Sequence, residues 1–166
     1  MALGPTNSHF LPPRLIAEED FFQRFQGANS IATDEGSTED SIISFEVGDC
    51  VTLFIRERVN GLIVRIFGHH FDSLSDQEEI REMISDFLQN EAGSSYRFCL
   101  IGGNGSEQSN ECVQRIRNVA NAFLQEGFRI KSLNEYLNLN QGHPFGYIHV
   151  NLRLKSRLVY CRSNGG

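Results

Sequence analysis

Apolar and polar positions alternate in several short stretches of the chain, and this pattern predicts β-strands. Residues 41–47 and 51–56 carry branched and aromatic side chains at strand-like spacing, with a Gly48-Asp49 kink between them. The later Asn60-Gly61 pair predicts a tight hairpin turn, because both residue types tolerate positive φ. The return strand is expected over residues 62–67.

Two later segments show the spacing of amphipathic helices. One helix is expected over residues 76–89, with Ser75 as N-cap and Glu78 three residues later, as in a capping box. A second is expected over residues 110–126 and ends at Gly127, because glycine suits the position after a helix. Their apolar stripes are Ile80, Met83, Ile84, Phe87 and Leu88, and then Val113, Ile116, Val119, Ala120 and Phe123.

Further strands follow and alternate with these helices. They are expected over residues 96–101, 129–133, 146–152 and 157–162, with an Asn/Gly-rich loop at 138–146. Strands before, between and after two helices predict a layered α/β fold with a sheet of mixed strand direction.

Residues 1–40 predict an N-terminal extension rather than part of this pattern. Acidic residues precede three aromatic ones at helical spacing, which predicts a short helix with the aromatic face Phe21, Phe22 and Phe25. Residues 28–40 are rich in Gly, Ser, Thr, Asp and Glu and predict a linker. The main domain is expected over residues 41–162, followed by a short tail at 163–166. The short helix either packs on that domain or serves as a partner-docking or secretion-related segment.

Length and charge narrow the function classes. The chain has 166 residues, which suits one domain, and its net charge is −6. It carries 15 Lys and Arg against 21 Asp and Glu, and we expect no nucleic-acid partner because phosphate binding takes clustered basic residues. No apolar stretch approaches the roughly 20 residues that span a bilayer, and the start lacks the features of a secretion signal. We therefore expect a cytoplasmic protein with no membrane partner.

Four cysteines are spread along the chain without a Cys-x-x-Cys pair: Cys50, Cys99, Cys112 and Cys161. In a reducing compartment this spacing favours free thiols rather than disulfides, zinc ligands or a redox couple. Cys50 differs from the others because Gly48-Asp49 precede it at the strand kink. A histidine across the hairpin is able to activate such a thiol as a nucleophile, but a buried structural thiol fits the same pattern.

Two other patterns favour structural roles. The Gly102-Gly103-Asn104-Gly105 loop follows a strand and precedes a helix, but it lacks the Lys and Ser/Thr of a phosphate-binding P-loop. Adjacent residues of a strand point to opposite faces, which argues against a metal site built on His69 and His70.

Several short motifs occur in an order that resembles the chemoreceptor glutamine deamidases, the CheD family. The resemblance covers about residues 41–162. Its motifs are Ser44, Gly48-Asp49-Cys50-Val51, the hairpin through Gly61, Ile101-Gly102-Gly103-Asn104, Arg117-Asn118-Val119, Glu126-Gly127-Phe128-Arg129-Ile130, Glu135, Gly142 and the segment 147–151.

The resemblance implies a fold and a chemistry. Family members share a three-layer α/β fold with cytotoxic-necrotizing-factor-type toxins and use a Cys–His–Thr set to hydrolyse a glutamine side-chain amide of a partner protein. Carried over, Cys50 is the catalytic nucleophile and Ser44 stands at the Thr position. The chemistry needs no cofactor and no metal. The partner is then a protein carrying a glutamine, either a chemoreceptor in a bacterial cytoplasm or a host protein if the chain is a delivered effector.

The sequence also departs from the family pattern. Arg65 occupies the position of the catalytic His, and Arg stays protonated and is unsuited to act as a base. His69, on the same strand face as Arg65, is the favoured substitute, and His70 is the alternative base. Asp49 next to Cys50 is expected to raise the thiol pKa, which opposes nucleophilic catalysis. Two hypotheses follow: a protein-glutamine deamidase with a displaced His, or a deamidase-like fold that has lost its chemistry and binds a protein.

Overall fold

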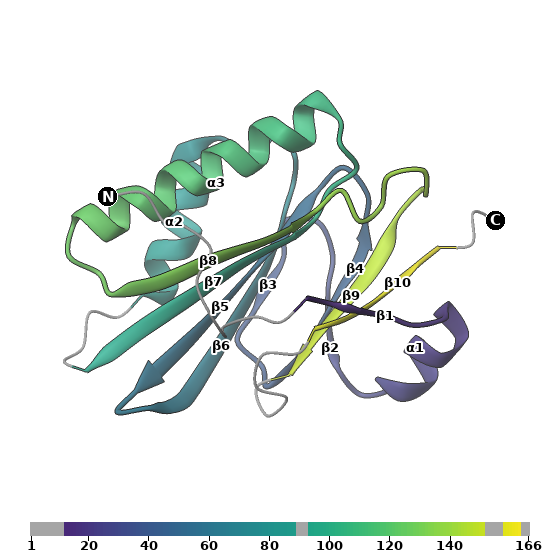
Figure 1. Cartoon of the computed structure of the whole chain (residues 1–166), viewed down its shortest axis with the longest axis horizontal. Helices are drawn as coiled ribbons and strands as arrows, with labels where there is room; N and C mark the ends of the chain where they lie inside the picture. Colours follow the sequence, from purple (N-terminus) through teal and green to yellow (C-terminus); the bar gives the residue numbers. More distant parts are fainter. Residues whose placement is uncertain (1–11, 89–92, 152–157, 164–166) are drawn as a thin grey trace.

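The computed structural model describes residues 12–88, 93–151 and 158–163, which form two five-stranded β-sheets and three helices (Figure 1). Sheet A has the strand order β1 (Arg14–Leu15), β10 (Val159–Arg162), β9 (Gly146–Asn151), β4 (Ser41–Val47) and β2 (Asn29–Ile31). Sheet B has the order β3 (Gly36–Ser37), β6 (Leu62–Phe71), β5 (Val51–Val59), β7 (Ser94–Gly102) and β8 (Ile130–Leu137). The helices are α1 (Glu18–Arg24), α2 (Gln77–Phe87) and α3 (Glu107–Gln125). The predicted mixed α/β class is confirmed.

The β5–β6 hairpin is the centre of sheet B, and its predicted turn is confirmed. Asn60 and Gly61 have φ values of 51° and 82°, the left-handed conformations that a two-residue hairpin turn requires. β6 continues to Phe71, beyond the expected end of this strand at residue 67. The extension passes through Gly68, at which an added Cβ would lie 2.9 Å from the Phe54 ring. Glycine therefore permits close packing here rather than ending the strand.

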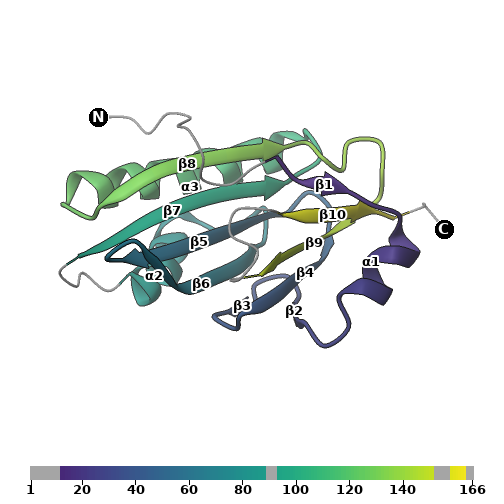
Figure 2. The same cartoon turned by 60° about the horizontal axis from the view of Figure 1, so that its bottom comes forward.

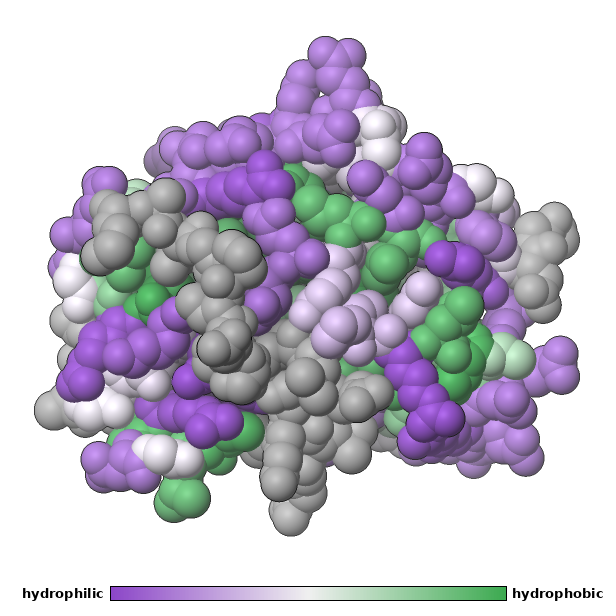
Figure 3. Space-filling view, viewed as in Figure 1, coloured by the Kyte–Doolittle hydropathy of each residue, from purple (hydrophilic) through white to green (hydrophobic). Residues whose placement is uncertain are grey.

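The helices α2 and α3 cover one face of sheet B (Figures 1 and 2), and their predicted apolar stripes are buried there, except that Met83 of α2 is exposed. The prediction that Ser75 caps α2 is wrong. The N-cap is Asp76, whose side chain accepts a hydrogen bond from the Glu79 N–H at 2.9 Å. α3 begins at Glu107, earlier than expected, because Ser106 caps it and accepts a hydrogen bond from the Ser109 N–H. Hydrophilic residues line the outer edge of the molecule at α3 (Figure 3).

Sheet A packs against the opposite face of sheet B. The core between the sheets joins apolar side chains from both: Ile42, Val47, Ile148 and Val150 of sheet A meet Phe54, Ile66, Cys99 and Ile101 of sheet B. The layer order is therefore α2 and α3, sheet B and sheet A, and α1 packs on residues of sheet A. This arrangement gives sheet B two buried faces, so that each of its strands has side chains in two different environments.

The N-terminal residues take part in both sheets. The segment 28–40, expected as a linker, instead contains β2, which pairs with β4, and β3, which pairs with β6. Helix α1 forms as predicted and buries Phe21 completely against Tyr147, at a ring-centroid distance of 6.2 Å. These contacts favour the hypothesis that the helix packs on the main domain. Some residues of the expected elements lie outside the described residues. They are 1–11 of the N-terminal extension, 89 of the first long helix, 152 and 157 of the last two strands, and 164–166 of the tail.

Within the described part of the chain, no helix combines the length and the apolar character needed to cross a membrane.

Candidate active site

Cys50 lies at one end of sheet B, where three connecting segments meet. It directly precedes β5, and its carbonyl oxygen accepts a hydrogen bond from the Gly103 N–H at 3.1 Å, in the turn that follows β7. The segment after β6 approaches from the other side, because the Ser73 hydroxyl donates to the Asp49 carboxylate at 3.1 Å. Cys50 is only 9% exposed. The kink predicted from Gly48-Asp49 thus places the thiol in a closely packed corner.

The surroundings of Cys50 stabilise the neutral thiol. Its Sγ donates a hydrogen bond to the Asp49 carboxylate at 3.6 Å. Burial raises the pKa of the Cys50 thiol to about 11, and the carboxylates of Asp49 and Asp72 add to this effect, while the Ser73 backbone opposes it. An activated cysteine shows the opposite shift, because only the thiolate is a strong nucleophile. The expectation that Asp49 raises the thiol pKa agrees with this environment.

The segment between β6 and α2 is held firmly against α3. The Arg115 guanidinium donates to the carbonyl oxygens of Ser73 at 3.3 Å and Ser75 at 2.8 Å. The Cys112 thiol donates to the carbonyl oxygen of Asp72 at 3.6 Å. These bonds fix the wall of the Cys50 corner that faces the helices.

Ser44 meets Thr52 rather than Cys50. Ser44 is fully buried in β4 of sheet A, and its hydroxyl lies 2.5 Å from the Thr52 hydroxyl of β5. Thr52 follows Cys50 by two positions, so Ser44 lies near the start of β5 without touching the thiol. Among the described residues no hydrogen bond joins Cys50 to Ser44 or to a histidine.

His69, the favoured base, belongs to the face of sheet B that the helices cover. It pairs with Leu53 in the β5–β6 register, and its ring stacks near Phe67 and Phe71, with centroid distances of 6.1 and 4.3 Å. Burial lowers its pKa to about 4. Leu53 lies three positions after Cys50, which is roughly 10 Å along a strand. His69 is neutral and available as an acceptor, but this register places it away from Cys50.

His70 belongs to the opposite face, toward sheet A. It pairs with Thr52, and because side chains alternate along a strand it shares the face of Thr52 and Ser44. Both ring nitrogens are buried, and burial lowers the His70 pKa, while a hydrogen bond with the Ile31 backbone opposes this shift. Cys50 precedes β5 and has no partner in this register, but the carboxylates of Asp49 and Asp72 act on both the Cys50 thiol and the His70 ring.

Arg65, at the position of the family histidine, has a structural role. Its guanidinium donates to the Glu57 carboxylate at 2.7 Å and to the Phe87 carbonyl oxygen at 2.8 Å, and it lies 4.1 Å from the Phe87 ring centroid. These contacts tie the end of α2 to the hairpin. The Gly102–Gly105 loop is equally structural, because a Cβ at Gly103 would lie 2.6 Å from the Ser109 hydroxyl.

The described residues hold no group of three or more His, Cys, Asp and Glu side chains placed to bind a metal ion. Sequence reasoning missed Thr52, which joins Ser44 and His70 at the start of β5. Its signal is position alone: a polar residue two places after Cys50, within the apolar first half of β5. Comparison of the chain with protein-family models and with curated proteins finds no match.

Proposed function

We propose that this chain is a protein-binding domain built on a three-layer, deamidase-like α/β fold, in which Cys50 is a structural thiol. The observation that carries this proposal is the contact of the Cys50 thiol with the Asp49 carboxylate instead of a histidine. Hydrolysis of a glutamine amide through cysteine requires a thiolate, which attacks the amide carbon and forms a thioester as ammonia leaves. A carboxylate beside a buried thiol disfavours that thiolate.

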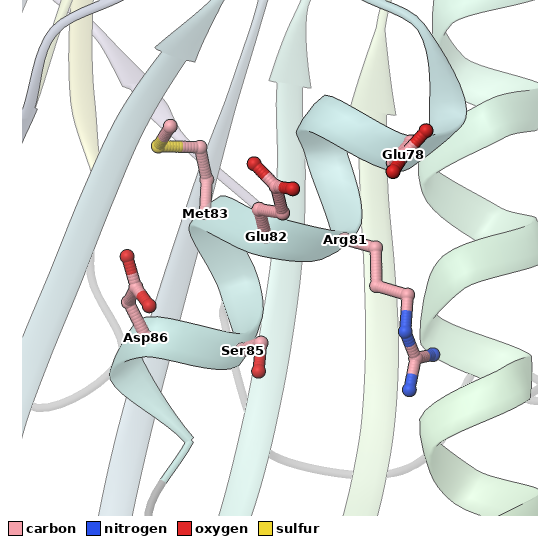
Figure 4. Close-up of a pocket in the computed structure, with 6 residues that line it drawn as sticks. All are labelled: Glu78, Arg81, Glu82, Met83, Ser85 and Asp86. Carbon is pink, nitrogen blue, oxygen red and sulfur yellow. The ribbon is translucent and has the colours of Figure 1, made fainter.

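The surface of α2 supports a binding role. Its exposed acidic residues are Glu78, Glu79, Glu82 and Asp86, while its single basic residue, Arg81, is paired with Glu126 at 2.7 Å. Two apolar side chains are exposed within or beside this surface, Met83 at 39% and Leu74 at 68%. Figure 4 shows Glu82 and Met83 neighbouring each other on α2 while Arg81 extends toward α3. A shallow hollow of about 410 Å³ lies on this face.

An acidic surface with exposed apolar side chains is complementary to a partner segment that carries Lys or Arg around apolar anchors. The probe for this test is a fluorescent amphipathic peptide of Lys and Leu. We expect saturable binding that weakens in the Glu78→Gln/Glu82→Gln variant. The matched control is Glu39→Gln/Asp40→Asn, which removes the same charge from two exposed residues directly before β4 of sheet A. Equal weakening in both variants would show a net-charge effect and overturn the proposed surface.

The catalytic half of the proposal has its own test. Wild-type protein and Cys50→Ser are incubated with casein, a glutamine-containing protein without stable structure, and ammonia release is measured. We expect the same background with both proteins. Ammonia release that disappears in Cys50→Ser would overturn the structural role of the thiol.

A second candidate function is the protein-glutamine deamidase itself, and the Ser44–Thr52 contact beside His70 favours it. In this version Cys50 is the nucleophile and His70, rather than His69, accepts its proton and returns it to the leaving ammonia. Water then hydrolyses the thioester to glutamate. Such activity would be lost in Cys50→Ser and His70→Gln and retained in His69→Gln. Loss of the activity in His69→Gln alone would instead identify His69, the histidine favoured by the sequence, as the base.

A further inference from the structure

A small cavity lies between α2 and the turn that joins β2 to β3. Its lining combines two carboxylates, a hydroxyl, an imidazole and two apolar side chains: Asp34, Glu79, Ser75, His69, Phe71 and Met83. Met83 is on the side of α2 that points away from Arg81 (Figure 4). The cavity volume is about 260 Å³, below the roughly 300–1,000 Å³ of sites for drug-sized ligands. Its size therefore suits a single side chain or a similarly small group.

The buried side of the cavity is aromatic. His69 and Phe71 occupy alternate positions of β6, so both face the helices, and their ring centroids are 4.3 Å apart. His69 is 5% exposed, and burial lowers the pKa of its ring to about 4, so the imidazole is neutral at about pH 7 and keeps an acceptor nitrogen. Within the part of the chain that the structure describes, the His69 ring forms no hydrogen bond. This side thus offers flat ring surfaces and an acceptor.

The open side of the cavity carries the carboxylates of Asp34 and Glu79, both exposed residues. The fold fixes Asp34, because its N–H donates to the His70 carbonyl oxygen at 2.7 Å and its carboxylate accepts from the Ser75 hydroxyl at 3.5 Å. Its φ is 65°, a left-handed conformation that Asp and Asn adopt more readily than other non-glycine residues. Asp34 is therefore preorganised at the mouth of the cavity, and Glu79 faces it from α2.

The mouth of the cavity is negatively charged. The carboxylates of Asp76 and, to a smaller extent, Asp34 raise the pKa of Glu79. Asp34 also favours the protonated ring of His69, although the larger effect of burial keeps that ring neutral. Lys and Arg do not occur among the described residues that line the cavity. A cation placed between Asp34 and Glu79 would be attracted by both carboxylates and would reduce their mutual repulsion.

We propose that this cavity binds the guanidinium group of one arginine side chain of the partner protein. A guanidinium is planar, stacks on aromatic faces and presents several N–H donors, which match the rings of His69 and Phe71 and the two carboxylates. It is also more weakly hydrated than the ammonium of lysine, so it enters a partly buried site more readily. The methylene stem of the arginine would pack on Met83. This inference rests on the proposed function, which supplies a basic partner segment for α2.

The first test uses small probes and the full chain. The sequence has two methionines, so a protein labelled at its methionine methyl groups gives two NMR signals, and Met83→Leu identifies that of Met83. We expect N-acetyl-arginine amide to shift the Met83 signal saturably. N-acetyl-citrulline amide has the same shape without the charge and is expected to leave it unchanged. N-acetyl-lysine amide is expected to bind more weakly than the arginine probe.

Two conservative variants test the carboxylates. Asp34→Asn keeps a residue type that suits the left-handed backbone, and Glu79→Gln keeps the side-chain length. Each is expected to weaken binding of the arginine probe at least about threefold. The matched control is Asp40→Asn, an exposed residue outside the cavity lining, which leaves the affinity at the wild-type value. Absence of a saturable shift, equal binding of the citrulline or lysine probe, or equal weakening in Asp40→Asn would each overturn the proposal.

A peptide comparison separates this proposal from the proposed function. The Lys–Leu peptide is compared with versions in which one Lys is replaced by Arg. We expect one Arg version to bind more tightly, and this preference to disappear in Asp34→Asn but persist in the Glu78→Gln/Glu82→Gln variant. Binding of all the peptides with equal affinity would overturn the arginine site and leave the protein-binding function intact. If the arginine probe binds and no peptide does, the cavity is supported and the acidic surface of α2 is overturned.

Discussion

The state of the Cys50 thiol gives a quantitative prediction about its reactivity. With a pKa of about 11, roughly 0.03% of the thiol is ionised at about pH 7.5, against roughly 10% for a free cysteine. The alkylation rate is proportional to the thiolate fraction, so we expect Cys50 to react about 300-fold more slowly than a free thiol. Its low exposure slows the reaction further.

Asp49→Asn separates the two causes of this shift. The amide retains an acceptor for the thiol but removes the negative charge, so the pKa of Cys50 falls. It remains above that of a free thiol, because burial is the larger cause. The assay is chloroacetamide labelling over a pH series, with peptide mass spectrometry to follow Cys50 separately from the three other cysteines.

Asp40→Asn, at an exposed position, is the charge-matched control and leaves the profile unchanged. A wild-type Cys50 pKa below roughly 8.5, the ordinary value for cysteine, would refute the reasoning because it would mean that a cation or a base acts on the thiol.

Three further predictions concern stability. Burial lowers the folded-state pKa of His149 to about 4, so the unfolded chain binds more protons than the folded chain between about pH 6.5 and 4. The stability from this group is complete above that window and falls by about 3 kcal/mol through it, with about 2 kcal/mol lost by about pH 5. Urea unfolding at about pH 7.5 and 5 checks this, and the pH dependence shrinks in His149→Gln. Gly68→Ala brings a methyl group into the packed space between the sheets and costs about 1–3 kcal/mol, whereas the exposed Ser85→Ala changes stability by less than about 0.5 kcal/mol; denaturant midpoints distinguish them, and equal midpoints contradict the packing argument. Phe21→Ala removes the buried anchor of α1 and costs about 3–5 kcal/mol, in contrast to the exposed Gln23→Ala, and an unchanged melting temperature would show that α1 does not stabilise the fold.

The elements that local sequence determines could be predicted. The strand over 41–47, the Asn60-Gly61 turn and the end of α3 at Gly127 depend on near neighbours, and all three agree with the structure. β2 and β3 could not be predicted, because their short polar sequences become strands only through pairing with distant strands. The residue Gly68 indicates a strand end in the sequence, but its small size serves the packing of two sheets.

The candidate site shows the same division between local and distant information. The kink at Cys50 and the adverse effect of Asp49 follow from adjacent residues. The choice between His69 and His70 depends on the register of a hairpin, and a shift of one residue exchanges the two faces. The pairing of Arg56 with Arg97 could not be predicted either, because it depends on the register of β5 with β7.

The central claim is that Cys50 is not a nucleophile for glutamine amides. A diazoketone analogue of glutamine tests it without knowledge of a partner, because such compounds alkylate cysteines that are activated toward glutamine. The account predicts that the intact mass of the protein stays unchanged after incubation with the analogue. One-to-one labelling at Cys50 that is absent in His70→Gln would contradict the account and establish a catalytic thiol.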